Sequence, residues 1–232
     1  MGGSDTTKPP NCIRISSINH GGIKPSLYPG ILHQAALQQI DIQGYPEHNL
    51  NTLKYQVRKQ LSQHLKRHNQ HSKSIWSTSA TPTLSDFKPG GTALITLGKT
   101  SDRVKDMVAD PLGRWCYTLL DGRAGREILI IIIYQCVKPT NNTGQATHHQ
   151  QTLQLSLMNR PNTNPRFNFH KDLSKLLRTH QQRNPHCVPI ILGDFNETCH
   201  GTSNSAKLCT EFNLVDVWSC LLYTSPSPRD KR

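Results

Sequence analysis

The chain has 232 residues, enough for one large domain or two small ones. It contains 27 Lys and Arg against 15 Asp and Glu, and the resulting formal net charge of +12 favours polyanionic partners. The longest uninterrupted apolar run, residues 128–133, is far shorter than the roughly 20 residues of a membrane-spanning helix, and no secretory signal opens the chain, so that a membrane protein and a secreted protein are both disfavoured. The seven cysteines include no C-x-x-C pair, which fits reduced thiols and an intracellular location, in the nucleus or the cytoplasm.

The first 50 residues predict short strands and one helix. Residues 1–11 are polar and contain two glycines and two prolines, which predicts a disordered lead-in. Isoleucines at positions 13, 15 and 18 indicate a first strand, and residues 32–39 are typical of a helix. Residues 40–42 then predict a second short strand, which ends before Pro46.

Residues 51–71 predict an amphipathic helix with a basic exposed face. Asn51 is a candidate N-cap, and leucine or valine recurs every four residues from Leu53, as one buried helix face requires. The other positions carry no acidic side chain. The basic residues that we expect to contact nucleic acid are Lys54, Arg58, Lys59, Lys66 and Arg67. These side chains either follow a phosphate backbone or simply face water, as charged helix positions usually do.

The rest of the chain predicts further strands and a second helix. The six aliphatic residues 128–133 do not alternate with polar ones, which indicates a strand buried on both faces. Residues 188–192 predict another buried strand, and a helix with Phe169 and Leu173 on its apolar face precedes it. We expect residues 138–151 to be a polar loop. The remaining strands are predicted at residues 92–97 and 115–120. Because strands and helices alternate without a linker, we expect one α/β domain.

Two polar residues follow the last predicted strand. Asp194 and Asn196 lie two residues apart, so that in a continued strand both would point to one face while Phe195 packs on the other. A rigid strand of this kind could aim a carboxylate and an amide at one reacting centre. Asp and Asn after a strand are also a common turn. The spacing alone leaves both interpretations open.

The sequence I-L-G-D-F-N at residues 191–196 resembles the hallmark of the endonuclease/exonuclease/phosphatase superfamily, which has the DNase I-like fold. The chain is most similar to the endonuclease domains of non-LTR retrotransposons, and other motifs occur in the family's order. Residues 18–22 resemble its first strand, which ends in a catalytic Asn, and residues 40–47 its second strand with a metal-binding Glu. Residues 88–92 resemble a Gly-Gly turn before a core strand, and residues 132–134 the strand that presents a catalytic Tyr.

This resemblance implies an α/β, DNase I-like four-layer sandwich, with two facing β-sheets and helices outside, in an endonuclease/exonuclease/phosphatase domain at residues 12–219. It also implies hydrolysis of a phosphoester with a divalent metal. Glu47 would bind Mg²⁺, or Mn²⁺ in its place, with Asn19 alongside as metal ligand and catalytic residue. Asp194 would orient or deprotonate the attacking water, Asn196 would hold that carboxylate and the phosphate, and Tyr134 would stabilise charge on the phosphate oxygens.

Each of these residues also has a plainer interpretation. Asn19 could close a turn, Glu47 could be a surface acid, and Tyr134 could end a strand with its hydroxyl in water. The flanks of Glu47 depart from the family pattern, because Pro46 and His48 stand where the family has Gln and Thr. A zinc cluster from residues 186–187 and 199–200 is disfavoured, since the spacing is unlike that of common zinc fingers.

The C-terminal end of the sequence departs furthest from the family. The family's Arg/Asp-containing strand and its Ser-Asp-His motif do not follow Asp194. Residues 220–230 read CLLYTSPSPRD, which resembles the in-frame translation of a transposase sequencing adaptor. We therefore expect residues 220–232 to be a non-native tail, the domain to be incomplete at its C-terminus, and the fragment as given to be inactive.

The leading hypothesis is a Mg²⁺-dependent DNA-nicking endonuclease domain of a retroelement. Its partner would be DNA, and it would be fused to, or act with, a reverse transcriptase that extends the nicked 3′ end. One alternative keeps the fold and hydrolyses a small phosphoester, as a phosphatase or phosphodiesterase does. Another is an inactive, basic DNA-binding remnant of a decayed element.

Overall fold

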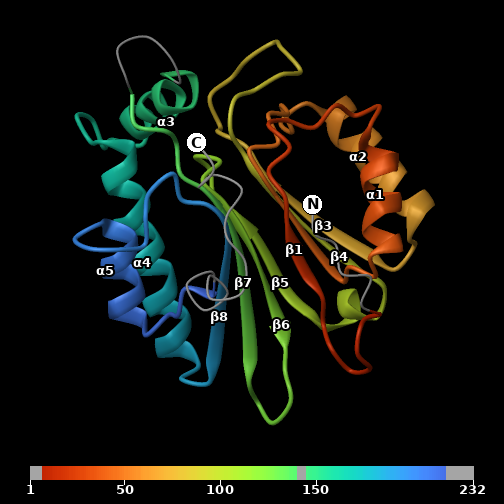
Figure 1. Ribbon diagram of the computed structural model, residues 1–232. Helices are drawn as coiled ribbons and strands as arrows, with labels where there is room; N and C mark the ends of the chain where they lie inside the picture. Colours follow the sequence, from red (N-terminus) through yellow and green to blue (C-terminus); the bar gives the residue numbers. More distant parts are fainter. Residues whose placement is uncertain (1–6, 140–144, 218–232) are drawn as a thin grey trace, which may run out of the picture.

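The protein forms two β-sheets that face each other, with helices on both outer sides (Figure 1). The structure is a computed structural model, and it describes residues 7–139 and 145–217. The expected foreign tail, residues 220–232, lies outside the described residues, as do residues 1–6 of the expected lead-in.

The first sheet has the order β1-β2-β4-β3. Its strands, in that order, are Ile15–Ser17, Ile42–Pro46, Thr92–Leu97 and Ser72–Ser77. The second sheet has the order β5-β6-β7-β8. Its strands are Val104–Ala109, Trp115–Asp121, Glu127–Tyr134 and Cys187–Asp194. The pairs β1–β2 and β7–β8 are parallel, and the other neighbours are antiparallel.

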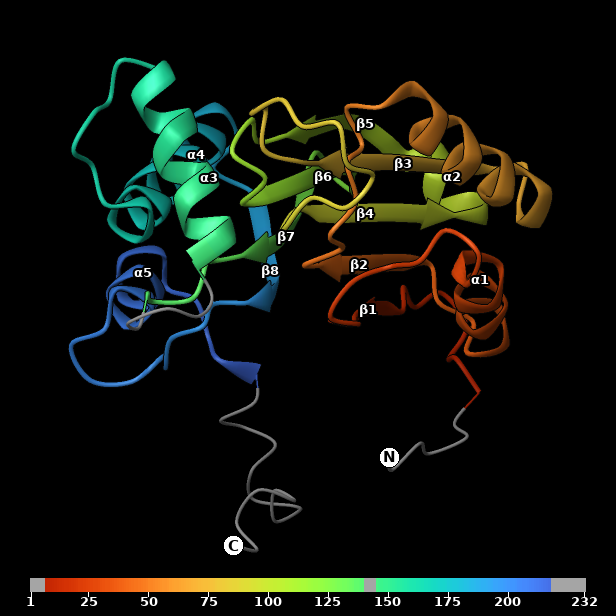
Figure 2. The ribbon, with the colours of Figure 1, turned by 90° about the horizontal axis from the view of Figure 1, so that it is seen from above.

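Figure 2 shows the four layers side by side. Helices α1 (Tyr28–Leu37) and α2 (Tyr55–His68) cover the outer face of the first sheet, and α4 (Pro165–Arg183) and α5 (Asn204–Phe212) cover that of the second. Between the sheets lies an apolar cluster whose fully buried members are Ile42, Leu94, Cys116, Leu120, Ile130 and Ile132. The expected sandwich is therefore confirmed, and the buried face of each element follows the apolar spacing of its sequence.

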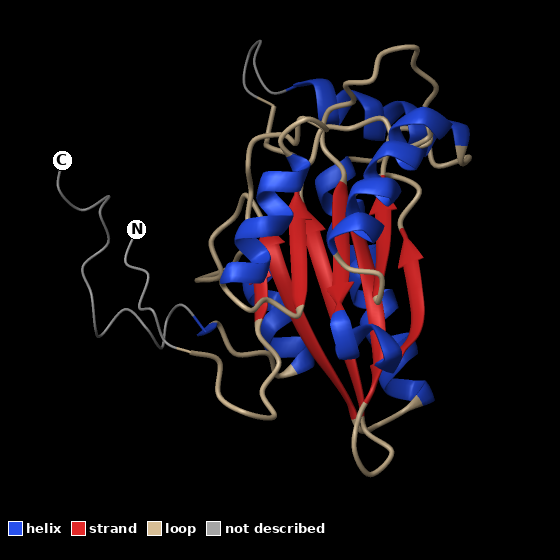
Figure 3. Cartoon of the chain, turned by 90° about the vertical axis from the view of Figure 1, so that its right-hand side faces the viewer, coloured by secondary structure: helices blue, strands red, loops and turns tan. Residues whose placement is uncertain are grey.

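The two parallel pairs bring polar residues to one end of the sandwich. Parallel neighbours end at the same edge of a sheet, and in the register of β7 and β8 Tyr134 lies opposite Asp194. The sheets also approach closely at this end, because a Cβ atom on Gly44 of β2 would collide with Cδ1 of Ile132 on β7. The cartoon in Figure 3 shows the strands running between the two ends of the sandwich, with long loops above them.

The structure corrects several expectations about the elements. Residues 145–151 belong to a helix, α3 (Gln145–Leu157), and not to a polar loop. The side chains of Thr147, Gln151 and Leu155 are buried at a spacing of four residues, so its inner face is mostly polar and gave no apolar periodicity. Asn51 is not an N-cap, since α2 begins at Tyr55 and Asn51 instead donates hydrogen bonds to a neighbouring loop.

The strand assignments also needed correction. Strands β3 and β5 and helix α5 were not predicted, because their short segments mix polar and apolar residues without a clean period. Strand β8 is less buried than expected, with Val188 48% exposed, because β8 lies at an edge of its sheet among the described strands. The expectation of a doubly buried strand at residues 128–133 is confirmed by β7.

Candidate active site

Polar side chains from both sheets meet where β1, β2, β7 and β8 end. Asn19 lies just beyond β1, Glu47 directly follows β2, and Asp194 ends β8. The amide nitrogen Nδ2 of Asn19 donates to Oε2 of Glu47 at 3.0 Å and lies 3.5 Å from Oδ2 of Asp194. One amide therefore joins two carboxylates that belong to opposite sheets.

The backbone at Glu47 and Asn19 is specialised to place these side chains. Glu47 has φ +56°, in the left-handed region that non-glycine residues rarely adopt, and this turns its side chain out of the strand direction. Oδ1 of Asn19 accepts a hydrogen bond from the backbone N–H of Gly21 at 2.8 Å. Asn19 thus closes a turn and at the same time points its Nδ2 towards Glu47, while its catalytic role stays a prediction.

Tyr134 joins the same group from the end of β7. Its side chain is buried, and its hydroxyl donates to Glu47 and accepts from Thr147 of α3. Burial, followed by the charge of Glu47, raises the pKa of the Tyr134 phenol well above its ordinary value. The phenol therefore stays protonated at neutral pH and keeps a proton to donate at the site.

Asp194 and Asn196 form a turn and do not share one strand face. Strand β8 ends at Asp194, and Asn196 has φ +44°. The backbone N–H of Asn196 donates to Oδ1 of Asp194 at 2.9 Å, as in an Asx turn, while Nδ2 of Asn196 donates to the carbonyl of Gln135 at 2.8 Å. Of the two interpretations that the spacing left open, the structure shows the turn. Phe195 does pack inwards, with its ring 6.3 Å from that of Phe169.

The Gly90-Gly91 turn packs directly against the site, as the sequence led us to expect of a turn before a core strand. Both glycines have positive φ, +81° and +84°. A Cβ atom on Gly90 would lie 2.7 Å from Cγ2 of Thr147 and 3.4 Å from the ring of Tyr134, and one on Gly91 would lie 2.6 Å from the ring of His48. Only glycine fits at either position without displacing these side chains.

Sequence reasoning missed two residues that support the site. Thr147 lay in a segment assigned to a loop, and nothing in its neighbourhood marked it. Arg166, in the first turn of α4, donates from Nη1 to the carbonyl of Cys136 at 2.5 Å and from Nη2 to the carbonyl of Asn196 at 3.1 Å. It thereby ties the segment after Tyr134 to the segment after Asp194. A cation at a helix N-terminus opposes the helix dipole, and this unfavourable placement is the one sequence signal that could have singled it out.

A second cluster of polar side chains supports the turn at Asp194 and Asn196 from the side of α4 and α5. Nε2 of His170 lies 2.8 Å from Nε2 of Gln135 and 3.0 Å from Oε2 of Glu197. The other carboxylate oxygen of Glu197 accepts a hydrogen bond at 2.8 Å from the backbone N–H of Asn204, the first residue of α5. Burial lowers the pKa of His170, an effect that the charge of Glu197 partly opposes. These contacts connect α4, α5 and the turn that carries Asp194.

The basic residues of α2 lie at two different ends of the sandwich. Lys54 pairs with Asp86 at 2.6 Å, and Lys59 lies 5.9 Å from the ring centre of Tyr55, both at the start of α2 on the side of Glu47. The last turn of α2 contains Lys66 and Arg67 and lies at the opposite end. There Lys66 donates to the carbonyl of Ser72, the first residue of β3, at 2.7 Å.

Two carboxylates at an open strand end suit a hard divalent ion, which takes oxygen ligands and keeps several waters. Glu47 would supply such an oxygen, with the carboxylate of Asp194 from the other sheet close by, whereas Asn19 turns its nitrogen towards both, so its role as a metal ligand stays a prediction. Within the described residues, no three His, Cys, Asp or Glu side chains come close enough to hold a metal.

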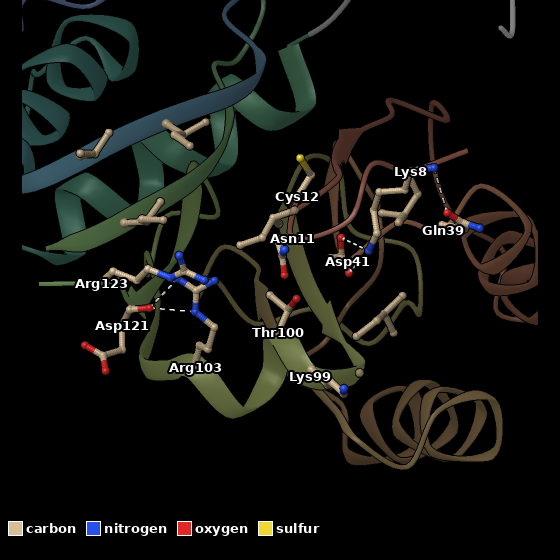
Figure 4. Close-up of a pocket in the computed structure, with 18 of the residues that line it drawn as sticks. Lys8, Asn11, Cys12, Gln39, Asp41, Lys99, Thr100, Arg103, Asp121 and Arg123 are labelled. Atoms are coloured by element: carbon tan, nitrogen blue, oxygen red, sulfur yellow. Dashed lines mark hydrogen bonds and ion pairs between the residues drawn. The ribbon is translucent and has the colours of Figure 1, made fainter. Parts of the chain in front are cut away.

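A cavity of about 1250 Å³ lies at the other end of the sandwich, away from these residues (Figure 4). Figure 4 shows the ion pair of Lys8 with Asp41 and the bond from Arg103 to the carbonyl of Asp121 on its wall. Val188 and Ile190 of the edge strand β8 also line it. The cavity is thus an opening between the sheets and is separate from the candidate active site.

No protein-family model matches the chain, and no curated protein is significantly similar in sequence. The chain is similar in structure to the catalytic domain of human Nocturnin, solved with a bound sulfate anion, at 17% identity over 93% of this chain and 76% of that chain, with a TM-score of 0.50. It is also similar to an AP endonuclease from Archaeoglobus fulgidus, at 14% identity over 92% of this chain and 76% of that one, with a TM-score of 0.52. These likenesses show that the fold is DNase I-like. Among the described residues, no helix is long and apolar enough to cross a membrane.

Proposed function

We propose that the protein is a Mg²⁺-dependent phosphodiester hydrolase of the endonuclease/exonuclease/phosphatase type that nicks DNA as part of a retroelement. One observation carries the proposal: Glu47 and Asp194, from opposite sheets, meet at the amide of Asn19. Two carboxylates held this close at a solvent-accessible strand end, beside a protonated phenol, are the groups that metal-assisted attack on a phosphodiester needs.

The role of each residue follows from its contacts. When bound, Mg²⁺ would neutralise charge on the phosphate and act as a Lewis acid, and Glu47 would hold it, with Mn²⁺ able to take its place. The N–H of Asn196 holds Oδ1 of Asp194, which leaves Oδ2, the oxygen nearest Asn19, to orient the water and accept its proton. Tyr134, whose proton points to Glu47 in this structure, would turn that proton towards developing negative charge on the phosphate when a substrate is bound.

Two features support DNA as the substrate. The chain carries a formal charge of +12, and the first turns of α2, with Lys54, Arg58 and Lys59, lie on the site's side of the molecule. The structurally similar protein from Archaeoglobus fulgidus is an AP endonuclease. The retroelement context, with a reverse transcriptase fused or acting in concert, rests on the sequence motifs alone.

The test is nicking of supercoiled plasmid in Mg²⁺ by the full-length protein. We expect open-circular product from the wild type. Asp194→Ala should lose nicking by at least about a thousandfold, because it removes the group that activates water, and should keep salt-sensitive DNA binding. Asp121→Ala, an exposed acid at the far end of β6, is the matched control and should nick normally.

Three results would contradict the proposal in different ways. Turnover of an inositol phosphate without nicking would identify a small-phosphoester hydrolase. Salt-sensitive DNA binding without any hydrolysis would identify an inactive DNA-binding remnant. Unchanged nicking by Asp194→Ala would mean that the active site lies elsewhere.

A further inference from the structure

An apolar projection stands beside the candidate active site and plays no part in the chemistry described above. Residues 78–91, which we call the rim loop, join β3 to β4 at the end of the sandwich where Glu47 lies. Figure 1 draws this loop in gold, projecting from the top of the first sheet. Near its tip, Leu84 is 95% exposed, and Phe87 is 59% exposed.

The rim loop is held firmly although its side chains are exposed. The buried amide of Asn51 donates to the carbonyl oxygens of Thr83 at 3.0 Å and Ser85 at 2.8 Å, on either side of Leu84. At the base of the loop the buried ammonium of Lys88 donates to the carbonyls of Ser79 and Thr81. Leu84 is therefore held out in solvent by the hydrogen bonds of its neighbours, and its exposure does not come from a lack of anchoring.

The surroundings of Leu84 are apolar and basic at once. The backbone N–H of Asn51 donates to the carbonyl of Asp86 at 2.8 Å, which sets the start of α2 against the loop. Exposed Leu53 and Tyr55 lie in that adjoining segment. The loop's acid, Asp86, is paired with Lys54, while Arg58 and Lys59 follow on α2 without an acidic neighbour on that helix. An apolar tip next to the basic start of a helix suits a polyanion with an apolar interior better than it suits a protein surface.

We propose that the rim loop is a wedge, and that Leu84 inserts between adjacent base pairs of duplex DNA next to the site of cleavage. Apolar side chains inserted at a base step unstack it and kink the duplex, at a cost of a few kcal/mol that additional contacts offset. The basic start of α2 supplies those contacts to the phosphates. The inference rests on the proposed action on DNA and deepens it, because it names a deformable duplex as the substrate form.

The test measures base unstacking directly and needs no catalysis. Short duplexes, each with one 2-aminopurine at a successive position, are titrated with the protein in the absence of divalent metal, since 2-aminopurine fluorescence rises when the base loses its stacking. We expect the wild type to raise the fluorescence at one or two adjacent steps. Leu84→Ala should abolish this rise and weaken binding only about fivefold, because the phosphate contacts that dominate affinity remain.

The matched control is Leu37→Ala, which removes an equally apolar side chain, 64% exposed, at the end of α1 far from Glu47. It should behave as the wild type does. Salt-sensitive DNA binding without a fluorescence rise would contradict the wedge but not the proposed function. A fluorescence rise that Leu84→Ala retains would do the same. Absence of salt-sensitive DNA binding contradicts the proposed function and the wedge with it. Self-association that Leu84→Ala removes would identify a second copy as the occupant and would also overturn the inference.

Discussion

At the scale of single residues, the candidate site depends on which atoms of each side chain are already engaged. The Tyr134 hydroxyl has two hydrogen-bond partners: it accepts from Thr147 and donates to Glu47. Asn196 uses its amide to hold the carbonyl of Gln135. These bonds fix the positions of the phenol and of the turn after Asp194 before a substrate arrives, as a pre-organised site requires.

Replacing Thr147 tests this arrangement. In Thr147→Val the shape is kept but the donor is lost, so the Tyr134 hydroxyl is free to rotate away from Glu47. We expect kcat for phosphodiester hydrolysis by the full-length protein to fall about tenfold with KM nearly unchanged, a cost of about 1.4 kcal/mol in the transition state. Thr147→Ser should restore kcat.

The control for this experiment is Thr152→Val on the same helix, whose hydroxyl donates only to the carbonyl of His148 at 2.9 Å. If both valine variants lose activity equally, the effect comes from α3 as a whole and not from the contact with Tyr134.

At the scale of elements, the sequence predicted those whose apolar residues recur regularly. The Leu53 to Leu65 series identified α2, and the uninterrupted aliphatic run identified β7. Helix α3 was missed because its buried face carries Thr147 and Gln151, and helix periodicity is read from apolar residues. The turn at Asp194 and Asn196 was predicted as one of two interpretations, since local spacing alone cannot decide whether a strand continues.

The same limit applies to the site. Asn19, Glu47, Tyr134 and Asp194 were predicted from the motifs that they share with a known family, and the structure brings these four together. Arg166 was not predicted because its function depends on carbonyl oxygens of two loops that are distant in the sequence. Long-range backbone contacts of this kind leave no pattern in a single chain.

Helix α4 is joined to the second sheet by a buried ion network. The guanidinium of Arg114, 2% exposed, makes two bonds to Asp110, at 2.8 and 2.9 Å, and one to Asp172 of α4 at 2.9 Å. Arg114→Met would leave the buried carboxylate of Asp110 without its cation, while Asp172 keeps its ion pair with Arg160. We expect the free energy of unfolding to fall by about 3–5 kcal/mol, as measured by urea denaturation.

Arg178→Met is the matched control, because Arg178 pairs with Glu211 at the surface. Its loss should change the free energy of unfolding by less than about 1 kcal/mol. Equal effects of the two substitutions would show that the buried network does not hold α4 in place.

At the scale of the whole molecule, the facing sheets serve to bring distant segments to one point. Glu47 comes from the first sheet and Asp194 from the second, and the amide of Asn19 contacts both. At the opposite end the sheets open into the cavity lined by Val188 and Ile190 of β8.

The most direct test of the account is to map where a bound metal lies. Fe²⁺ can replace Mg²⁺ at an oxygen site. With ascorbate and peroxide, the bound Fe²⁺ cleaves the nearby protein backbone, and mass spectrometry of the fragments identifies the cleaved positions. The account predicts cleavage near both Glu47 and Asp194, competed by Mg²⁺ and lost in Glu47→Gln, while Glu211→Gln on α5 leaves the pattern unchanged. Cleavage confined to one of the two segments, or unaffected by Mg²⁺ and by Glu47→Gln, would contradict a single metal site shared by the two sheets.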